Sequence, residues 1–221
     1  MRKHLPILII ITAVIITAAV YPQIPERMPT HWSIRGEVDG WSRRLWGAWL
    51  LPLLMPVLWG IFRGLPHIDP RKANYAKFAS TYEWIIASVL AFMLLMQVII
   101  LAAATGRDVP MERVTPFGVG VMFLIIGNLL PRARSNWFVG IRTPWTLTSE
   151  RSWERTHRVG GYVLVLIGLA MIVVSFVSPV RGLIILPFVV FPVVLLLIAY
   201  SYFVWKQDKH SGAVDQNELT K

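Results

Sequence analysis

Two stretches of this 221-residue chain carry the side chains best suited to chemistry. The first is residues 22–44, which we call loop 22–44; its His31, Glu37 and Asp39 are nitrogen and oxygen donors of the kind that bind cations. These three residues have neither the helical nor the hairpin spacing that is typical of metal ligands. We therefore expect them to cap turns and to pair with Arg35 and Arg43 rather than to hold a metal.

The second stretch, loop 131–158, holds six arginines, three tryptophans and one histidine. Its C-terminal part is predicted to be helical, because Thr148 or Ser149 can cap a helix and Glu150 would lie in the favourable first turn. We expect a compact unit at the membrane surface in which Glu150 or Glu154 holds Arg142.

On that helix, Glu150, Trp153, Glu154 and His157 share one face. Glu154 and His157 have the spacing of half a di-metal carboxylate site, but the chain has no second Glu-x-x-His. We therefore expect a polar face packed on the preceding residues, and no metal or cofactor.

Several function classes are excluded or disfavoured by what the chain lacks. Without cysteine there are no disulfides, thiol nucleophiles or iron–sulfur clusters. No catalytic motif of the common hydrolase, metalloprotease or phosphate-binding types occurs. We expect no enzyme, but two alternatives stay open: a membrane enzyme using Arg142, Glu150 and His157 from one pocket, and a small transporter with a polar cavity at mid-membrane.

The elements that must position these loops are membrane spans. Apolar residues make up 55% of the chain and charged residues 15%, against about 45–50% and about 25% in soluble domains. Six segments approach the roughly 20 apolar residues that cross a bilayer: 5–21, 45–62, 84–104, 114–130, 159–178 and 183–205. The sequence predicts an all-α polytopic membrane protein with six transmembrane helices. Polar Gln97 and Asn128 within the spans are expected to face other helices.

The positive charge predicts orientation. With the N-terminus inside, the inner segments carry 15 Lys and Arg and the outer loops 7, which indicates that both termini are cytoplasmic. Loop 22–44 would then be outside and loop 131–158 inside. The formal charge of +10 is assigned to lipid headgroups and not to nucleic acid, because no basic cluster is interleaved with an aromatic stacking platform.

Both loops resemble parts of a known family. Residues 127–158, with Gly-Ile-Arg-Thr-Pro-Trp-Thr-Leu at 140–147 and Trp-x-x-Thr-His-Arg at 153–158, resemble the signature of the SdpI family of bacterial membrane proteins. Residues 29–41, with Pro-Thr-His-Trp and Asp-Gly-Trp, are similar to the small uncharacterised domain often found at that family's N-terminus. In loop 131–158 and the span before it, the functional residues are expected to be Asn128, Asn136, Gly140, Arg142, Thr143, Pro144, Trp145, Glu150, Trp153, His157 and Arg158. In loop 22–44 they are expected to be Pro29, His31, Trp32, Gly36, Asp39, Gly40 and Trp41.

The resemblance implies a multi-pass protein of the bacterial plasma membrane that gives immunity against a secreted peptide toxin, relays a signal to a cytoplasmic regulator, or does both. Its partners would be membrane lipids, a toxin on the outer face and a regulator on the inner face. The expected units are an N-terminal two-helix unit at 1–62, a third span with flanking loops at 63–113, a three-helix SdpI-like unit at 114–205 and a polar tail at 206–221.

The orientation can be tested by labelling single cysteines, because the chain has none of its own. An impermeant thiol reagent added to intact cells should label Glu37→Cys strongly, since loop 22–44 is predicted to face outward, and should spare Glu150→Cys until the cells are opened. The opposite labelling pattern would reverse the predicted orientation.

Overall fold

The computed structural model describes the backbone of residues 4–219 and the side chains of residues 4–210. Long helices dominate it, joined by short helical turns and one pair of strands. In chain order the elements are α1 (Leu5–Val20), η2 (Tyr21–Gln23), β1 (Arg27–Trp32), β2 (Val38–Arg43), α2 (Arg44–Ile68), α3 (Lys72–Tyr75), η3 (Ala76–Phe78), α4 (Ala79–Ala104), α5 (Met111–Leu129), η4 (Leu130–Arg132), α6 (Pro144–Thr148), α7 (Glu150–Val177) and α8 (Pro179–Leu219).

Six helices, namely α1, α2, α4, α5, α7 and α8, are long and apolar enough to cross a membrane, which confirms the prediction of six such helices. The C-terminal helix is longer than expected. The sequence suggested a polar tail from residue 206, whereas α8 continues as one helix to Leu219. No Gly or Pro breaks it immediately after the apolar stretch, and the polar residues extend the same backbone pattern.

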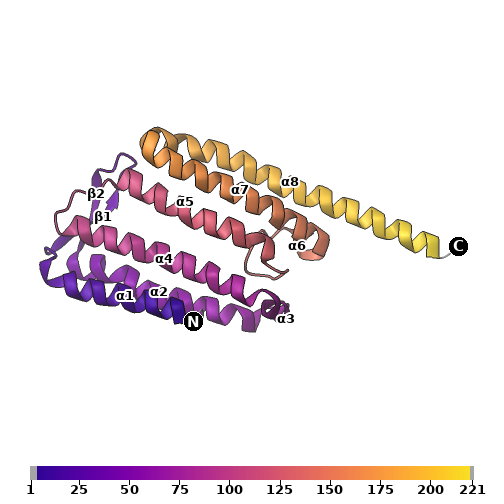
Figure 1. Ribbon diagram of the computed structural model, residues 1–221, viewed down its shortest axis with the longest axis horizontal. Coiled ribbons are helices and arrows are strands. Elements are labelled where there is room, and N and C mark those ends of the chain that lie inside the picture. Colours follow the sequence, from indigo (N-terminus) through magenta and orange to yellow (C-terminus); the bar gives the residue numbers. More distant parts are fainter. Residues whose placement is uncertain (1–3, 220–221) are drawn as a thin grey trace.

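The long helices lie side by side, and the two loops lie at opposite ends of the bundle (Figure 1). The strands β1 and β2 are at one end, while α3, α6 and loop 131–158 are at the other. This separation agrees with the prediction that the two loops serve opposite membrane faces and cannot share a site. Helix α1 starts near the middle of the bundle's length and runs toward the strands, whereas α8 extends beyond the α6 end.

Loop 22–44 forms a β-hairpin, which the predicted all-α fold did not include. Strands β1 and β2 pair antiparallel as a hairpin. Its turn is closed by the Ser33 amide, which donates to the Glu37 carbonyl at 2.8 Å. Gly36 supplies a positive φ of 81° in that turn, a conformation that residues with a Cβ rarely adopt. The prolines of this loop obscured its strand character, because proline is tolerated in edge strands but weakens a sequence-based strand prediction.

Helix α4 packs against both α1 and α2 and joins them through a buried amide. Gln97 Nε2 donates to Thr17 Oγ1 at 2.8 Å and to the Ala48 carbonyl at 2.9 Å. The side chain is fully buried, so the expected helix-to-helix role of Gln97 is confirmed. Asn128 differs, because it is exposed and its Nδ2 donates to the Leu124 carbonyl of its own helix. The expectation that Asn128 faces another helix was wrong.

Helices α5 and α7 form the most extensive helix pair of the structure, and glycines allow their backbones to approach closely. Gly120 faces Gly168 and Gly127 faces Gly161, an antiparallel register in which the two glycines of each helix are seven positions apart. A Cβ built on Gly127 would lie 2.8 Å from the Gly161 carbonyl oxygen, and one built on Gly120 would lie 2.7 Å from the Gly168 carbonyl oxygen. Small residues at such a contact increase van der Waals packing between membrane helices.

Gly127→Ala should lower the stability of the protein in detergent by about 1–3 kcal/mol, because the methyl group would force the α5 and α7 backbones apart. Gly60→Ala in α2 is the matched control, since a Cβ there meets nothing within 4 Å. The measurement is the free energy of unfolding, or the midpoint of thermal unfolding where unfolding is irreversible. Equal loss for both variants would show that the helix contact does not depend on these glycines.

Candidate functional site

Loop 131–158 is anchored to the bundle by the start of α7. Ser149 is the N-cap of α7, and its hydroxyl accepts from the Ser152 amide at 3.0 Å, as one of the two predicted caps. Thr143 caps the short helix α6 in a reciprocal capping box with Thr146. Each cap satisfies backbone amides that have no partner within their own helix.

Trp153 and His157 form the centre of this loop. Both side chains are fully buried, and their rings stack with centroids 3.9 Å apart. Trp153 Nε1 donates to the Ala133 carbonyl at 2.8 Å. The polar α7 face therefore packs on the preceding loop as expected, with its two aromatic members inside and Glu150 and Glu154 exposed.

The hydrogen bonds of His157 define one tautomer. Nδ1 lies 2.8 Å from the Trp153 carbonyl, which can only accept, so Nδ1 carries the proton. Nε2 then accepts from the Ile141 amide at 3.0 Å. Both ring nitrogens are engaged in holding the loop. Gly140 is required beside this ring, because its φ is 115° and a Cβ there would collide with Nε2.

Asn136 organises the turn that precedes Gly140. Its buried Oδ1 accepts from the Phe138 amide at 2.9 Å and the Val139 amide at 2.7 Å. Its Nδ2 donates to the carbonyls of Arg134 and Val139, both at 2.9 Å. One side chain thus satisfies four backbone groups, which explains a fully buried polar residue at this position.

The connection between α2 and α3 supplies partners that sequence reasoning missed. Asp69 is only 2% exposed, and its carboxylate accepts from the Arg71 amide at 2.7 Å, the Tyr75 hydroxyl at 3.0 Å and the Trp137 amide at 2.9 Å. The Arg71 guanidinium donates to Ser135 Oγ and to the Leu147 carbonyl. This Asp69 network joins the N-terminal half of the chain to loop 131–158. The available signal was the Asp69-Pro70 pair shortly after the second apolar segment, since such a pair is typical of a side-chain-capped turn.

The predicted partner of Arg142 was wrong. Arg142 is exposed and donates through Nη1 to the Trp137 carbonyl at 2.7 Å. Glu154 instead pairs with Arg134 at 2.8 Å, with both side chains about half exposed. The buried groups of loop 131–158 pair with backbone groups, neutral side chains and the Asp69 network, while the six arginines of the loop itself stay exposed.

Of the other residues that were expected to be functional in loop 131–158, some pack against α8 and others are exposed. The Trp145 ring meets the Tyr202 ring of α8 edge to face at 5.2 Å, and Thr143 Oγ1 lies 3.1 Å from Ser201 Oγ. Pro144 begins α6, while Glu150 and Arg158 are exposed. Arg142, Glu150 and His157 do not line one pocket, because His157 is enclosed while the other two face outward. The arrangement expected for the enzyme alternative is not formed by these residues.

At the other end of the bundle, the hairpin brings together two of the three residues whose side chains could donate to a cation. His31 Nδ1 lies 2.5 Å from Asp39 Oδ1, and both side chains are exposed. Asp39 therefore pairs with His31 and not with Arg35 or Arg43. Gly40 lies opposite His31, where a Cβ would approach the His31 Cβ to 2.7 Å. Within the described side chains of residues 4–210, no group of three or more His, Asp or Glu residues is placed to hold a metal ion.

The other residues of loop 22–44 that were expected to be functional differ in exposure. Pro29 is buried and Trp32 partly buried, whereas Trp41 is exposed. Gly36 packs closely on the Glu112 side chain of α5, leaving no room for a Cβ. This contact fixes the hairpin turn against the bundle.

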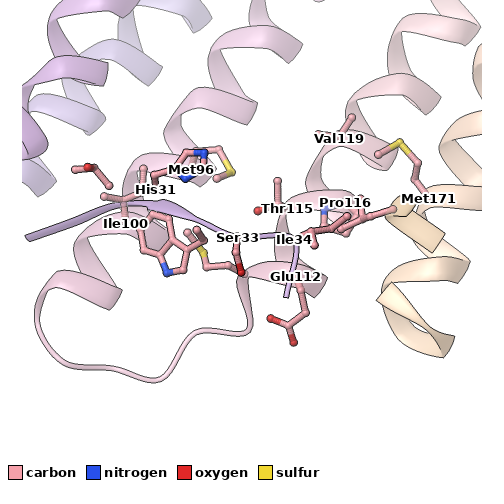
Figure 2. Close-up of a pocket in the computed structure, with 14 residues that line it drawn as sticks. His31, Ser33, Ile34, Met96, Ile100, Glu112, Thr115, Pro116, Val119 and Met171 are labelled. Carbon is pink, nitrogen blue, oxygen red and sulfur yellow. The ribbon is translucent and has the colours of Figure 1, made fainter. Parts of the chain in front are cut away.

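A cavity of about 390 Å³ opens between the hairpin and helices α4, α5 and α7. Figure 2 shows hairpin residues His31, Ser33 and Ile34 beside side chains such as Met96 and Met171 from the helices. The lining is largely apolar, and the Glu112 carboxylate lies at its edge, pointing away from the other labelled side chains. Methionine side chains adapt to ligands of irregular shape. The cavity is thus suited to an apolar group that arrives at the hairpin end.

Two segments of the chain match known families. Residues 132–202 match the SdpI/YfhL protein family, and residues 8–55 match a domain of unknown function, DUF1648. Immunity protein SdpI of Bacillus subtilis (strain 168) is 26% identical over 208 residues, which is 94% of this chain and 98% of that protein. No solved structure is significantly similar to the chain. The matches confirm the resemblance to the SdpI family and to its N-terminal domain.

Asp69→Asn should destabilise the protein by about 1–3 kcal/mol, because the amide cannot accept from all three donors and leaves one of them buried without a partner. Asp108→Asn, an exposed aspartate in the α4–α5 connection, is the matched control and should change stability little. Thermal unfolding of both variants in detergent compares them. An Asp69→Asn midpoint equal to wild type would show that the Asp69 network does not stabilise the fold.

Proposed function

We propose that this SdpI-like, multi-pass protein gives a bacterium immunity against a membrane-active peptide from its position in the plasma membrane, with both termini in the cytoplasm. The observation that carries the proposal is the 26% identity to an immunity protein across 94% of this chain and 98% of that relative. The likeness includes both loops and all six apolar helices, since it runs nearly end to end.

The cavity at the hairpin end is the place we assign to peptide contact. It is open, largely apolar and bounded on one side by the hairpin. A peptide that inserts in membranes presents apolar side chains at the bilayer surface. Transfer of such side chains from water into an apolar cavity lowers the free energy. Proton-coupled export is not part of the proposal, because no acidic or basic residue lies deep in a predicted span.

Loop 131–158 is the surface we assign to a cytoplasmic regulator. Its buried core of Trp153 and His157 holds the loop in one shape. Its exposed side chains include Trp137 and several arginines, and Trp and Arg are the residue types most enriched at binding hot spots. The distance between this loop and the hairpin, at opposite ends of the bundle (Figure 1), means that any relay acts through the helices.

The function is tested by survival of a peptide-sensitive bacterium that expresses the protein and is exposed to purified membrane-active bacterial peptides. Val119→Trp should fill the cavity and reduce protection about tenfold, the effect of losing roughly 1.4 kcal/mol of binding. Val57→Trp, at an exposed apolar position on α2, is the control and should protect like wild type. Immunoblots of the membrane fraction establish equal amounts of each protein.

Absence of protection by the wild-type protein against every peptide would contradict the immunity proposal. Protection that is equal in both tryptophan variants would contradict only the assignment of the cavity. Binding of a cytoplasmic regulator is measured in the same cells by comparing the cytoplasmic proteins captured by the wild-type protein and by the Arg155→Glu variant. This substitution changes an exposed charge and leaves the buried Trp153 and His157 in place.

A further inference from the structure

We propose that the base of the hairpin holds a binding site for the phosphate group of a membrane phospholipid. A groove of about 490 Å³ lies there, apart from the cavity described above. Three arginines line it, together with one acid and two ring or aliphatic side chains: Arg27, Arg43, Arg44, Glu26, Tyr21 and Leu45. We call this groove the arginine groove.

Two of the arginines form a like-charge pair. Arg27 of β1 and Arg43 of β2 are directly opposite each other in the hairpin register. Side chains at opposed positions lie on one face with Cβ atoms about 4.5–5.5 Å apart, and like charges there are destabilising. Both side chains are exposed, and among the described side chains neither makes an ion pair. An anion between the two guanidinium groups would turn this repulsion into attraction.

Arg44 is held in place beside that pair. Its amide donates to the Glu26 carbonyl at 2.8 Å, and its Nη1 donates to the Ile24 carbonyl at 3.4 Å. Its guanidinium carbon lies 4.8 Å from the centre of the Tyr21 ring. Arginine held in this way presents its remaining N–H groups in a fixed fork, the geometry that matches phosphate oxygens.

The start of α2 adds positive potential to the groove. Arg44 is the first residue of α2, the helix has no side-chain cap, and its first turn contains no acidic residue. The partial positive charge of a helix N-terminus therefore adds to that of the three guanidinium groups. Glu26 offsets only one of these charges.

The position of the groove favours a lipid phosphate over a free one. Leu45, which lines the groove, and Trp46 beside it are 56% and 63% exposed. They begin the apolar stretch of α2, one of the six helices suited to span a membrane. The arginines therefore lie where the apolar surface ends, which is the level of the headgroups, and exposed tryptophan is typical of that level. A phospholipid would place its phosphate among the arginines and its acyl chains along α2.

The site is tested by native mass spectrometry and thermal unfolding of the full-length protein in a neutral detergent, with phosphatidylglycerol as the probe. Wild-type protein should retain phosphatidylglycerol and unfold at a higher temperature in its presence. Arg27→Gln combined with Arg43→Gln should weaken binding about twenty-five-fold, from about fivefold for each arginine at a phosphate surface. Arg107→Gln, at an exposed arginine in the α4–α5 connection, should bind like wild type.

Further measurements separate a lipid-phosphate site from a free-phosphate site and from an arginine pair that binds no anion. Without lipid the double variant should unfold at or above the wild-type temperature, since the like-charge pair has been removed; a lower temperature would overturn the like-charge argument. Equal binding of phosphatidylglycerol by wild type and double variant would overturn the proposal. Displacement of the lipid by millimolar inorganic phosphate would overturn the lipid assignment and identify a free-phosphate site. Loss of peptide protection in cells is a separate readout, so the immunity proposal can fail while this one stands.

Discussion

The close backbone contact between α5 and α7 is the constraint on which the C-terminal half depends. Gly127 faces Gly161 where α5 ends and α7 enters the bundle. Their contact brings the first turns of α7 against the residues that follow α5, so Trp153 can reach the Ala133 carbonyl and His157 can reach the Ile141 amide. A wider helix separation would leave these buried polar groups without partners, at a high cost in free energy.

The loop built on that contact is a polar network with an exposed basic surface. Its buried members are neutral or accept from neutral donors: Asn136 serves four backbone groups, and the Asp69 carboxylate accepts from two amides and a hydroxyl. The arginines are therefore left at the surface, apart from Arg71, whose guanidinium joins the network. This division separates the residues that shape the loop from those that a partner would meet. Substitution of Trp153 or His157 would report on folding, whereas substitution of the exposed arginines would report on binding.

The hairpin end has two surfaces of different chemistry. The cavity between the hairpin and α4, α5 and α7 is largely apolar, while the arginine groove at the base of the hairpin is cationic. Both depend on the same hairpin, because β1 supplies residues to each and β2 supplies Arg43 to the arginine groove. A hairpin resting on a lipid phosphate would hold its turn, and the Gly36–Glu112 contact, at a constant height above the membrane. The two proposed ligands would then occupy neighbouring but separate sites.

Features that depend on neighbouring residues could be predicted from the chain alone. Apolar runs located the six helices that are long and apolar enough to cross a membrane, and the Thr148-Ser149 pair marked the start of α7, because helix formation depends on local composition and capping. The loop motifs identified the family resemblance. Contacts between remote segments emerged only when the helices and strands packed. No local pattern indicates that Asp69 accepts from the Trp137 amide, and charge suggested an acid for Arg142 where the folded loop offers a backbone carbonyl. The opposition of Arg27 and Arg43 likewise required the hairpin register. Such pairings depend on packing geometry, about which a single sequence carries little information.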